Sequence, residues 1–278
     1  CDEMNTLLWS FIELVKFCCE DQKLVDNVFS FEELTDKFYV SAPWVFNIWR
    51  DYIDQKENEK DDEMSNASSS DIITTFDKVM EKATFRDIDF THLSRDLFIT
   101  FWKLSLYDIH LDKKVYDECK EKLEALERKE ASSRKKNSIS HKIKKVLVSF
   151  ISHQRAFNHT KTMLLEKRKI WLEGFDSEEV KALLQYAIIP RILFTPSDAI
   201  YSALFILQTF EFKETFNIFN TLITSNILET LLFSCTSAEA GNLGMFFFTI
   251  IESIEKKRNE NDETVTPYKR ELYEWQYS

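Results

Sequence analysis

The chain has 278 residues and a formal net charge of -11, and it contains only three glycines and four prolines. Sheet proteins need glycine and proline at their many turns, whereas long helices avoid both residues. This composition therefore excludes a β-sandwich or barrel and predicts an all-α protein. The glycines stand at 174, 241 and 244, a spacing that excludes the glycine-rich loops that cradle nucleotide phosphates. No apolar run reaches the roughly 18 residues of a membrane span, so we expect no membrane insertion.

Three segments follow from the pattern along the chain. Residues 1–53 are predicted to form N-terminal helices, because apolar residues recur at helical spacing before and after Pro43. Residues 54–70 are acidic and then rich in serine, without an apolar period, which is typical of a linker or a long surface loop. Residues 71–278 are predicted to form the main helical domain.

Capping residues mark the first helices of this domain. Ser94 is predicted to cap one helix, because a side-chain oxygen at that position accepts from the free backbone N–H groups of the first turn, and a second, charged helix is predicted to follow Asp112. The first helix is expected to bury one side, formed by Leu97, Phe98, Phe101, Trp102 and Ser105. The second carries an apolar seam at near-heptad spacing, formed by Val115, Cys119, Leu123 and Leu126.

A polar break from Ala131 to Ser138 is predicted to precede a very long helix. That helix is expected to run to about Glu173 and to stop at Gly174, since glycine suits the left-handed position after a helix end. Its packing face is predicted from Ile143, Leu147, Phe150, Phe157, Leu164 and Trp171. This long helix and the charged helix before it are predicted to form a long helical hairpin over residues 112–173.

The segment after the long helix contains two prolines, Pro190 and Pro196. A helix is predicted to start at Ser177, which is followed by two glutamates, and to stop at Pro190, because proline lacks the N–H that would continue it. Thr195 with Pro196 at the first helical position is predicted to open a new helix. Successive helix pairs of about 30 to 45 residues are typical of solenoids. The predicted fold is therefore an all-α, HEAT-like array of antiparallel helix pairs with one long protruding hairpin.

A final capping box involves Thr236 and Glu239, and it is predicted to open a helix that ends near Arg258. Gly241 and Gly244 fall within this helix. We interpret them as small residues that allow another helix to approach closely.

Positive charge is concentrated on the hairpin. Residues 128–169 hold thirteen Lys or Arg against two acids, a net of +11, which leaves -22 for the rest of a chain whose total is -11. Such a basic arm on an acidic body steers a polyanion to one place. The candidate nucleic-acid-binding residues are Lys135, Lys136, Lys142, Lys144, Lys145, Lys167, Arg168 and Lys169. Two alternatives stay open, a solvated helix face and a face that meets an acidic partner subunit.

No residue set predicts catalysis or metal binding. His141, His153 and His159 do not share one helical face, so we expect no metal site among them. Asp87 and Asp89 have no histidine or lysine placed to complete a mechanism, and a turn role fits them better. Five cysteines at irregular spacing predict no disulfide framework. We therefore expect no enzyme, no cofactor and no small-molecule substrate.

Four stretches of the chain resemble one known family: Ala187 to Phe205, Leu97 to Asp108, Phe233 to Ala240, and Ile250 to Glu252. The family is that of the second and largest subunit of the THO complex, a nuclear scaffold that couples transcription to mRNA export. From about Phe85 onward the resemblance covers most of the chain. Residues 1–70 are placed in the family only by continuity.

The resemblance implies a helical-repeat middle domain of the type found in translation initiation factor 4G, whose relatives bind DEAD-box ATPases. It also implies a nuclear location and, as partners, the other THO subunits and a DEAD-box RNA-dependent ATPase. On this view the segment is a non-enzymatic scaffold that helps to dock and stimulate the ATPase. The alternative is an RNA-binding arm that acts through the basic hairpin. The face that binds a partner is not predicted.

Overall fold

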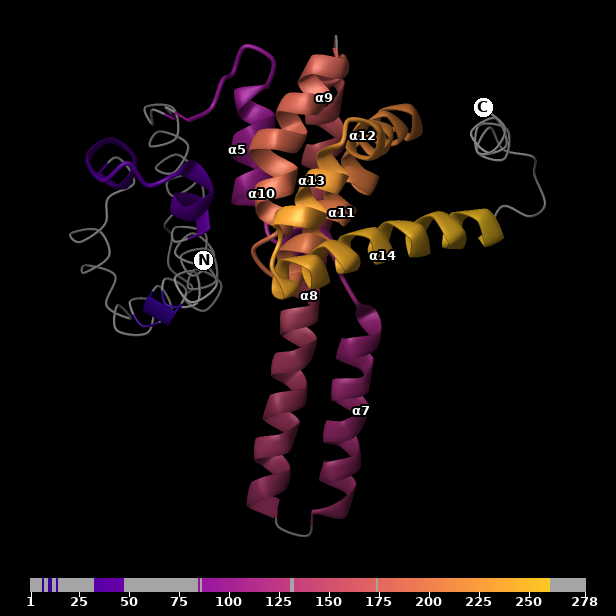
Figure 1. Cartoon of the computed structure of the whole chain (residues 1–278). Coiled ribbons are helices and arrows are strands. Elements are labelled where there is room, and N and C mark those ends of the chain that lie inside the picture. The colour runs from indigo at the N-terminus through magenta and orange to yellow at the C-terminus, as the bar shows by residue number, and fades with distance from the viewer. Residues whose placement is uncertain are drawn as a thin grey trace. The chain divides into compact units, whose positions relative to one another are not determined.

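The computed structural model describes residues 33–47, 85, 87–130, 133–173 and 175–260, together with four isolated residues, Leu7, Ser10, Phe11 and Leu14 (Figure 1). Throughout these ranges the backbone forms helices joined by turns and contains no strand, which confirms the all-α prediction. The predicted linker at 54–70 and the predicted helix end at Gly174 lie outside the described residues.

The chain divides into two compact units. Unit 1 takes in residues 1–104, 175–195 and 217–241, and unit 2 takes in residues 105–174, 196–216 and 242–278. Unit 1 contains η1 (Glu33–Lys37), α5 (Arg95–Lys103), α9 (Ser177–Leu183), η2 (Leu184–Ile188), α10 (Ile189–Ile192) and α13 (Ile227–Ser234). Unit 2 contains α6 (Leu106–Ile109), α7 (Lys113–Lys129), α8 (Ser133–Trp171) and α11 (Pro196–Thr209). Two helices, α12 (Phe212–Thr224) and α14 (Ser237–Glu260), contribute residues to both units.

Unit 1 is built around aromatic side chains that α5 contributes. Ser94 caps α5 as predicted, and its Oγ accepts from the backbone N–H of Leu97 at 3.4 Å. Phe98 and Trp102 of α5 are buried and pack against Phe46, with ring centroids 5.8 Å and 5.9 Å from it. The predicted apolar side of this helix is therefore the core of the unit, except that Ser105 lies beyond the helix end.

A buried arginine closes the C-terminal end of α5. The guanidinium of Arg191 donates to the carbonyl of Phe101, and also to that of Leu104 at 2.7 Å. It also lies over the rings of Phe101 and Trp102, at 5.1 Å and 5.6 Å from the centroids. Because the last carbonyls of a helix have no partner within the helix, a buried cation at this end satisfies them and complements the helix dipole.

The expectation that a helix stops at Pro190 is wrong. Residues 177–192 run through α9, η2 and α10 without a break, and Pro190 lies inside α10. The π-helical turn η2 makes this possible, since the N–H of Ile189 donates to the carbonyl of Leu184, five residues back. One extra residue in the turn shifts the hydrogen-bond register just before the residue that has no N–H to give. The helix therefore passes Pro190, and the predicted new helix still begins at Pro196.

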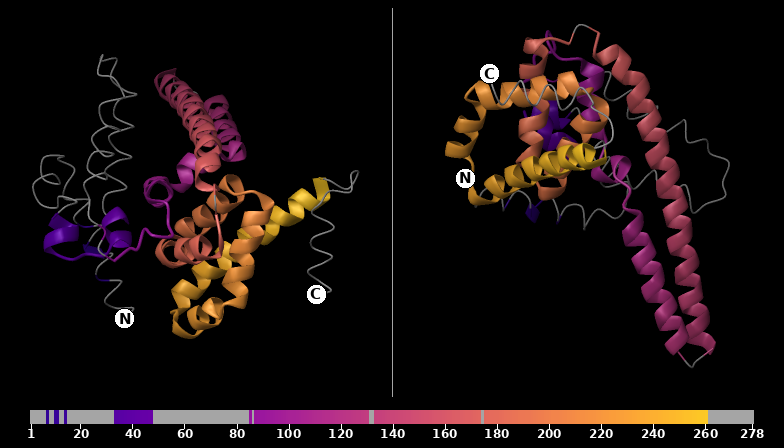
Figure 2. Two further views of the ribbon diagram at one scale, coloured as in Figure 1. Left: turned by 90° about the horizontal axis from the view of Figure 1, so that it is seen from above. Right: turned by 90° about the vertical axis from the view of Figure 1, so that its right-hand side faces the viewer.

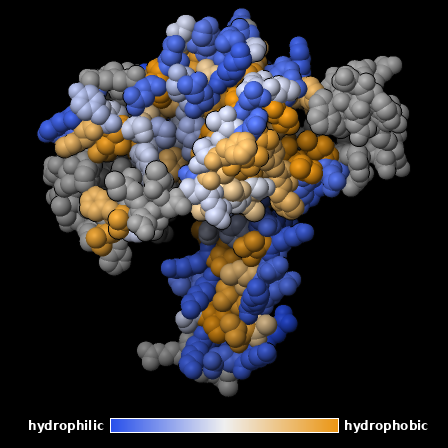
Figure 3. Space-filling view, in the orientation of Figure 1, coloured by the Kyte–Doolittle hydropathy of each residue, from blue (hydrophilic) through white to orange (hydrophobic). Residues whose placement is uncertain are grey.

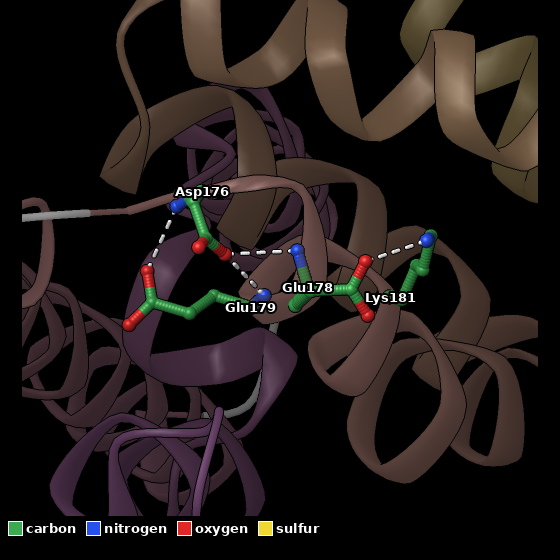
Figure 4. Close-up of polar contacts among 4 residues, drawn as sticks. All are labelled: Asp176, Glu178, Glu179 and Lys181. Atoms are coloured by element: carbon green, nitrogen blue, oxygen red, sulfur yellow. Dashed lines mark hydrogen bonds and ion pairs between the residues drawn. The ribbon is translucent and has the colours of Figure 1, made fainter.

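Helix α9 starts at Ser177 as predicted, and its first turn carries a capping box (Figure 4). Asp176 is the cap, and its Oδ1 accepts from the N–H groups of Glu178 and Glu179 at 2.8 Å and 3.0 Å. The Glu179 carboxylate accepts in return from the N–H of Asp176 at 2.9 Å. These backbone hydrogen bonds, from Glu179 first and then from Glu178, lower the pKa of the Asp176 carboxyl.

In unit 2, α7 and α8 lie side by side and run in opposite directions, with one short connection between them (Figures 1 and 2). The helix α8 begins at Ser133, so the predicted polar break up to Ser138 is too long, and it ends at Trp171 rather than near Glu173. Helices α6 and α11 contact the same helix, and the side-chain amide of Gln208 donates to the carbonyl of Ile109 at 2.9 Å. The HEAT-like repeat order, and the protrusion of a hairpin from it, stay predictions, as do the domain boundaries.

Helix α14 begins as predicted. The N–H of Thr236 donates to the Glu239 carboxylate at 2.8 Å, and the N–H of Glu239 donates to the Thr236 hydroxyl at 3.3 Å. The interpretation of Gly241 and Gly244 as close-packing residues is wrong, because a Cβ atom at either position would meet no atom within 4 Å.

Candidate functional site

The helix α8 carries the positive charge of the α7–α8 pair almost alone. It holds eleven Lys or Arg and one acid, Glu166, whereas α7 holds six basic and five acidic residues. The charges of α7 also pair along its own surface, as in Lys122 with Glu118 at 3.6 Å and Arg128 with Glu124 at 3.7 Å. The predicted basic arm is therefore a property of one helix, and its neighbour is close to neutral.

The eight predicted nucleic-acid-binding residues fall into two groups along α8. Lys135, Lys136, Lys142, Lys144 and Lys145 form a basic group near its first turns, and Lys167, Arg168 and Lys169 form a second near its end. From Lys145 to Lys167 the helix rises about 33 Å, at about 1.5 Å per residue. One short ligand therefore does not bridge the two groups.

The lysines of the first group are exposed and available for a ligand. Lys135 lies 3.9 Å from Glu130, and its side chain remains largely in solvent. Within the described ranges, Lys136, Lys142, Lys144 and Lys145 form no ion pair. Their directions differ, because each residue turns the helix by about 100°. The five lysines thus surround α8 with positive charge rather than forming one flat surface.

The second group is already engaged in the fold. Arg168 is partly buried, and its Nη2 lies 3.0 Å from Oε1 of Glu211, which joins α8 to the residue that precedes α12. The ammonium of Lys167 lies 5.8 Å from the ring centroid of Trp171, a buried residue of the next turn. Of these three residues, Lys169 is exposed, and Lys167 and Arg168 are partly buried. The first group is accordingly the better candidate for an interface.

A buried histidine fastens the α7–α8 pair at its inner end. Nε2 of His153 lies 2.7 Å from the carbonyl of Tyr107, and since a carbonyl only accepts, this nitrogen carries the proton. Nδ1 lies 2.8 Å from the hydroxyl of Tyr116, and the Tyr107 ring stacks on the imidazole with centroids 3.6 Å apart. One side chain of α8 thus holds both α6 and α7. The sequence pattern did not predict that His153 joins the helices. A signal was present, because His153 lies one turn after Phe150, which was assigned to the packing face.

Both apolar seams predicted for the pair need correction. In α7, Val115, Cys119 and Leu126 are exposed, and it is Tyr116 that contacts α8. In α8, Leu147 was assigned to the packing face but is 41% exposed. Apolar side chains consequently remain on the surface of the pair, and Figure 3 shows such a strip along it, bordered by polar residues. A helix that packs along one neighbour buries one narrow face there, so part of a wider apolar stripe stays in solvent.

Metal clusters and membrane-spanning helices are absent from the part of the chain that the structure describes. Across those ranges, no three His, Cys, Asp or Glu residues gather closely enough to hold a metal ion. No helix there has the length and apolar character needed to cross a membrane. Cys119 and Cys235 are free thiols.

Comparison with known proteins gives a consistent result. The family model described as "Transcription factor/nuclear export subunit protein 2" (Tho2) matches residues 90–275. The THO complex subunit 2 of Saccharomyces cerevisiae is 48% identical over 275 residues, which is 99% of this chain and 16% of that protein. This match also includes nearly all of the N-terminal segment that the resemblance placed only by continuity.

More distant relatives carry the same name. The Arabidopsis thaliana THO complex subunit 2 is 28% identical over 178 residues, covering 58% of this chain and 10% of that protein. The Homo sapiens protein is 25% identical over 180 residues, covering 59% of this chain and 11% of that protein. The chain thus spans about a sixth of the length of the yeast relative and less of the other two.

Proposed function

The chain belongs to the Tho2 family of THO complex subunit 2, and from this premise we propose that it is a scaffold segment of a THO complex that couples transcription to nuclear mRNA export. Its partners in this proposal are the other THO subunits and a DEAD-box RNA-dependent ATPase, and it acts in the nucleus without chemistry of its own. The single observation that carries the proposal is that 99% of this chain matches a part of the yeast subunit at 48% identity.

The surface of unit 2 supports an interaction role. The α7–α8 pair buries little, since α7 contributes no buried residue and α8 surrounds itself with exposed lysines. A helix that contributes so little to a core leaves most of its side chains in solvent, where another molecule can reach them. Apolar side chains remain exposed on both helices of the pair, as in Leu126 and Ile151.

Stimulation of an ATPase by a scaffold requires differential contact. A scaffold shifts the balance between the open and closed forms of the ATPase only to the extent that it binds one form more tightly. We therefore expect the segment to bind one nucleotide state of the ATPase more tightly than the other, and to raise ATP turnover only when RNA is present.

The test is a pair of binding experiments with purified components. The chain is mixed with the purified export ATPase in its apo and nucleotide-bound forms and, separately, with the other THO subunits. Retention of the ATPase in one nucleotide state, together with faster RNA-dependent ATP hydrolysis, is the expected result. Absence of binding both to the ATPase and to every sibling subunit would sink the scaffold proposal.

A second candidate function is an RNA-binding arm, favoured by the five exposed lysines of the first basic group. Binding of this kind acts through phosphates and ignores base identity, and it weakens steeply as salt rises. No stacking platform accompanies the lysines in α8, so we expect unrelated RNA sequences to bind alike.

Charge reversal tests this candidate. Changing Lys135, Lys136, Lys142, Lys144 and Lys145 to Glu should weaken binding equally for two unrelated single-stranded RNAs. It should also reduce the log-log salt slope by about 0.7 for each RNA phosphate that the variant no longer neutralises. The matched control changes four exposed lysines of α7 to Glu: Lys113, Lys114, Lys122 and Lys129. Unchanged RNA binding in the α8 variant, or an equal loss in the control, assigns the basic face to a protein partner instead.

A further inference from the structure

The helix α8 has a second apolar face that points away from α7. Leu147, Val148 and Ile151 are 41%, 66% and 47% exposed. With about 100° between successive residues, they lie about 120° to 160° around the helix from the buried His153. Packing on α7 therefore does not explain them, because the residues that meet α7 lie on the His153 side.

Phosphate binding does not explain these residues either. An RNA backbone is held by cations and hydrogen-bond donors, and an exposed aliphatic group contributes to neither. Apolar residues at positions i, i+1 and i+4 instead form the ridge that one helix presents to another. An amphipathic helix that lies along such a ridge covers its apolar stripe, which is a recurring mode of peptide recognition.

The charges around this face are all of one sign. Lys144 lies three residues before Leu147, Lys145 lies three before Val148, and Arg155 lies four after Ile151. These three side chains are exposed, and α8 contains no acid before Glu166. A second copy of the chain would bring the same cations against themselves, which opposes self-association, whereas a partner with acidic borders is attracted.

We infer that the outward face of α8 around Leu147, Val148 and Ile151 docks an amphipathic helix of a partner protein, whose apolar stripe is bordered by Asp and Glu. The partner helix covers the three aliphatic side chains, and its carboxylates meet Lys144, Lys145 and Arg155. Lys144 and Lys145 also belong to the first basic group, whereas Leu147, Val148 and Ile151 do not. Substituting these three aliphatic residues therefore tests the docking role separately from the RNA proposal.

Site-specific photo-crosslinking tests the inference in the full-length protein isolated with its natural partners. The photoreactive residue p-benzoylphenylalanine replaces Val148, and the crosslinked peptide is identified by mass spectrometry. The matched control places the same probe at Val115 of α7, which is also an exposed valine, at 61%. Charges of both signs surround Val115, so it lacks the basic border.

The expected product at Val148 is a crosslink to a helical segment of another protein, with apolar residues every three to four positions and acidic residues beside them. Its yield should exceed that at Val115 by about tenfold, because an interface core holds the probe against one partner. Four results would overturn the inference: a crosslink to RNA, to this chain or a second copy, to a segment without that pattern, or a yield no higher than at Val115.

Affinity measurements with the partner identified in this way complete the test. The triple variant Leu147→Ser, Val148→Ser, Ile151→Ser should bind it on the order of 100-fold more weakly, since the variant removes the apolar anchor. The double variant Val115→Ser, Leu126→Ser should change binding by less than about threefold. The triple variant should leave RNA binding unchanged, because it alters no charge, and an RNA defect would contradict the assignment.

Discussion

Helices α5 and α7 begin with the same local signals but are stabilised differently. Each has a capping side chain that accepts from the first turn, Ser94 in α5 and Asp112 in α7. Of the nine residues of α5 five are buried, whereas none of the seventeen residues of α7 is. Capping and periodicity therefore predict that a helix forms, and they do not predict how deeply it packs.

The two helices consequently rely on different energies. Burial of aromatic side chains and the contacts of Arg191 hold α5, and each large side chain removed from water contributes about 1.5 to 3 kcal/mol. In α7, exposed i,i+4 ion pairs such as Lys122 with Glu118 contribute only about 0.2 to 0.5 kcal/mol each. Substitutions in the α5 core should thus be far more costly than substitutions on exposed helix faces.

The largest predicted effect is that of Phe98→Ala in α5. Phe98 is 0% exposed, and its ring packs against those of Phe85 and Phe90, at 5.6 Å each. The cavity left by the ring should lower the free energy of unfolding by about 3 to 5 kcal/mol, as measured by urea denaturation. The same change at Phe233, which is 85% exposed, should cost less than about 0.5 kcal/mol. An equal loss of unfolding free energy at Phe98 and Phe233 would show that burial does not set the cost of these substitutions.

A smaller effect is predicted for the contact that holds α7. His153→Leu keeps the volume of the side chain but leaves the Tyr107 carbonyl and the Tyr116 hydroxyl without the ring nitrogens that now bind them. The cost should be about 1 to 3 kcal/mol of unfolding free energy, because buried polar groups lose their partners. His159→Leu, at an exposed position of the same helix, is the control and should be near neutral. If both variants are near neutral, His153 does not fasten the pair.

Helix starts were predicted well because capping is a local property. Ser94, Thr236 and the pair Thr195 with Pro196 each mark the observed beginning of a helix. The passage through Pro190 was not predictable, because it depends on the π-helical turn before it and on a register shift of one residue. In a sequence, a proline alone predicts that the helix ends there. Only the surrounding backbone shows how the missing N–H is tolerated.

The candidate site was predictable in composition but not in arrangement. Counting charged residues located the basic segment. The structure was needed to show that Lys145 and Lys167 lie far apart along one helix. It was also needed to show that Arg168 forms an ion pair with Glu211. Leu147 was assigned to the inner face because its position fits a broad apolar stripe. Which part of such a stripe is covered depends on the neighbouring helices, and no local pattern records that.

Gly244 tests how much intrinsic helix propensity contributes at a position where packing contributes nothing. Gly244 lies within α14, and a Cβ atom there would meet nothing within 4 Å. Gly244→Ala should raise the free energy of unfolding by about 0.5 to 1 kcal/mol, because alanine loses less backbone entropy on folding and no clash opposes it. Ala240→Gly, at an exposed position one turn earlier, is the inverse control and should cost a similar amount. A loss of stability in Gly244→Ala would mean that a neighbour does pack against this position.

The smallest predicted effect concerns the cap of α9, which resembles α5 in burying several side chains and so needs its cap least. The folded-state pKa of Asp176 is lowered from 3.8 by the backbone N–H groups of Glu179 and Glu178. Because the folded pKa is the lower one, the carboxylate stabilises the fold above the unfolded value, near pH 4, and this contribution is lost as pH falls through the folded pKa.

Asp176→Asn keeps an oxygen that accepts from the first turn but carries no charge. The stability difference between wild type and this variant should therefore be present at pH 7, shrink below about pH 4, and vanish once Asp176 is protonated in both states. Urea denaturation at several pH values measures it, with Asp117→Asn, within α7 rather than at its cap, as the control. A difference for Asp176→Asn that stays constant down to strongly acidic pH would show that the cap works by hydrogen bonding alone and that its charge contributes nothing.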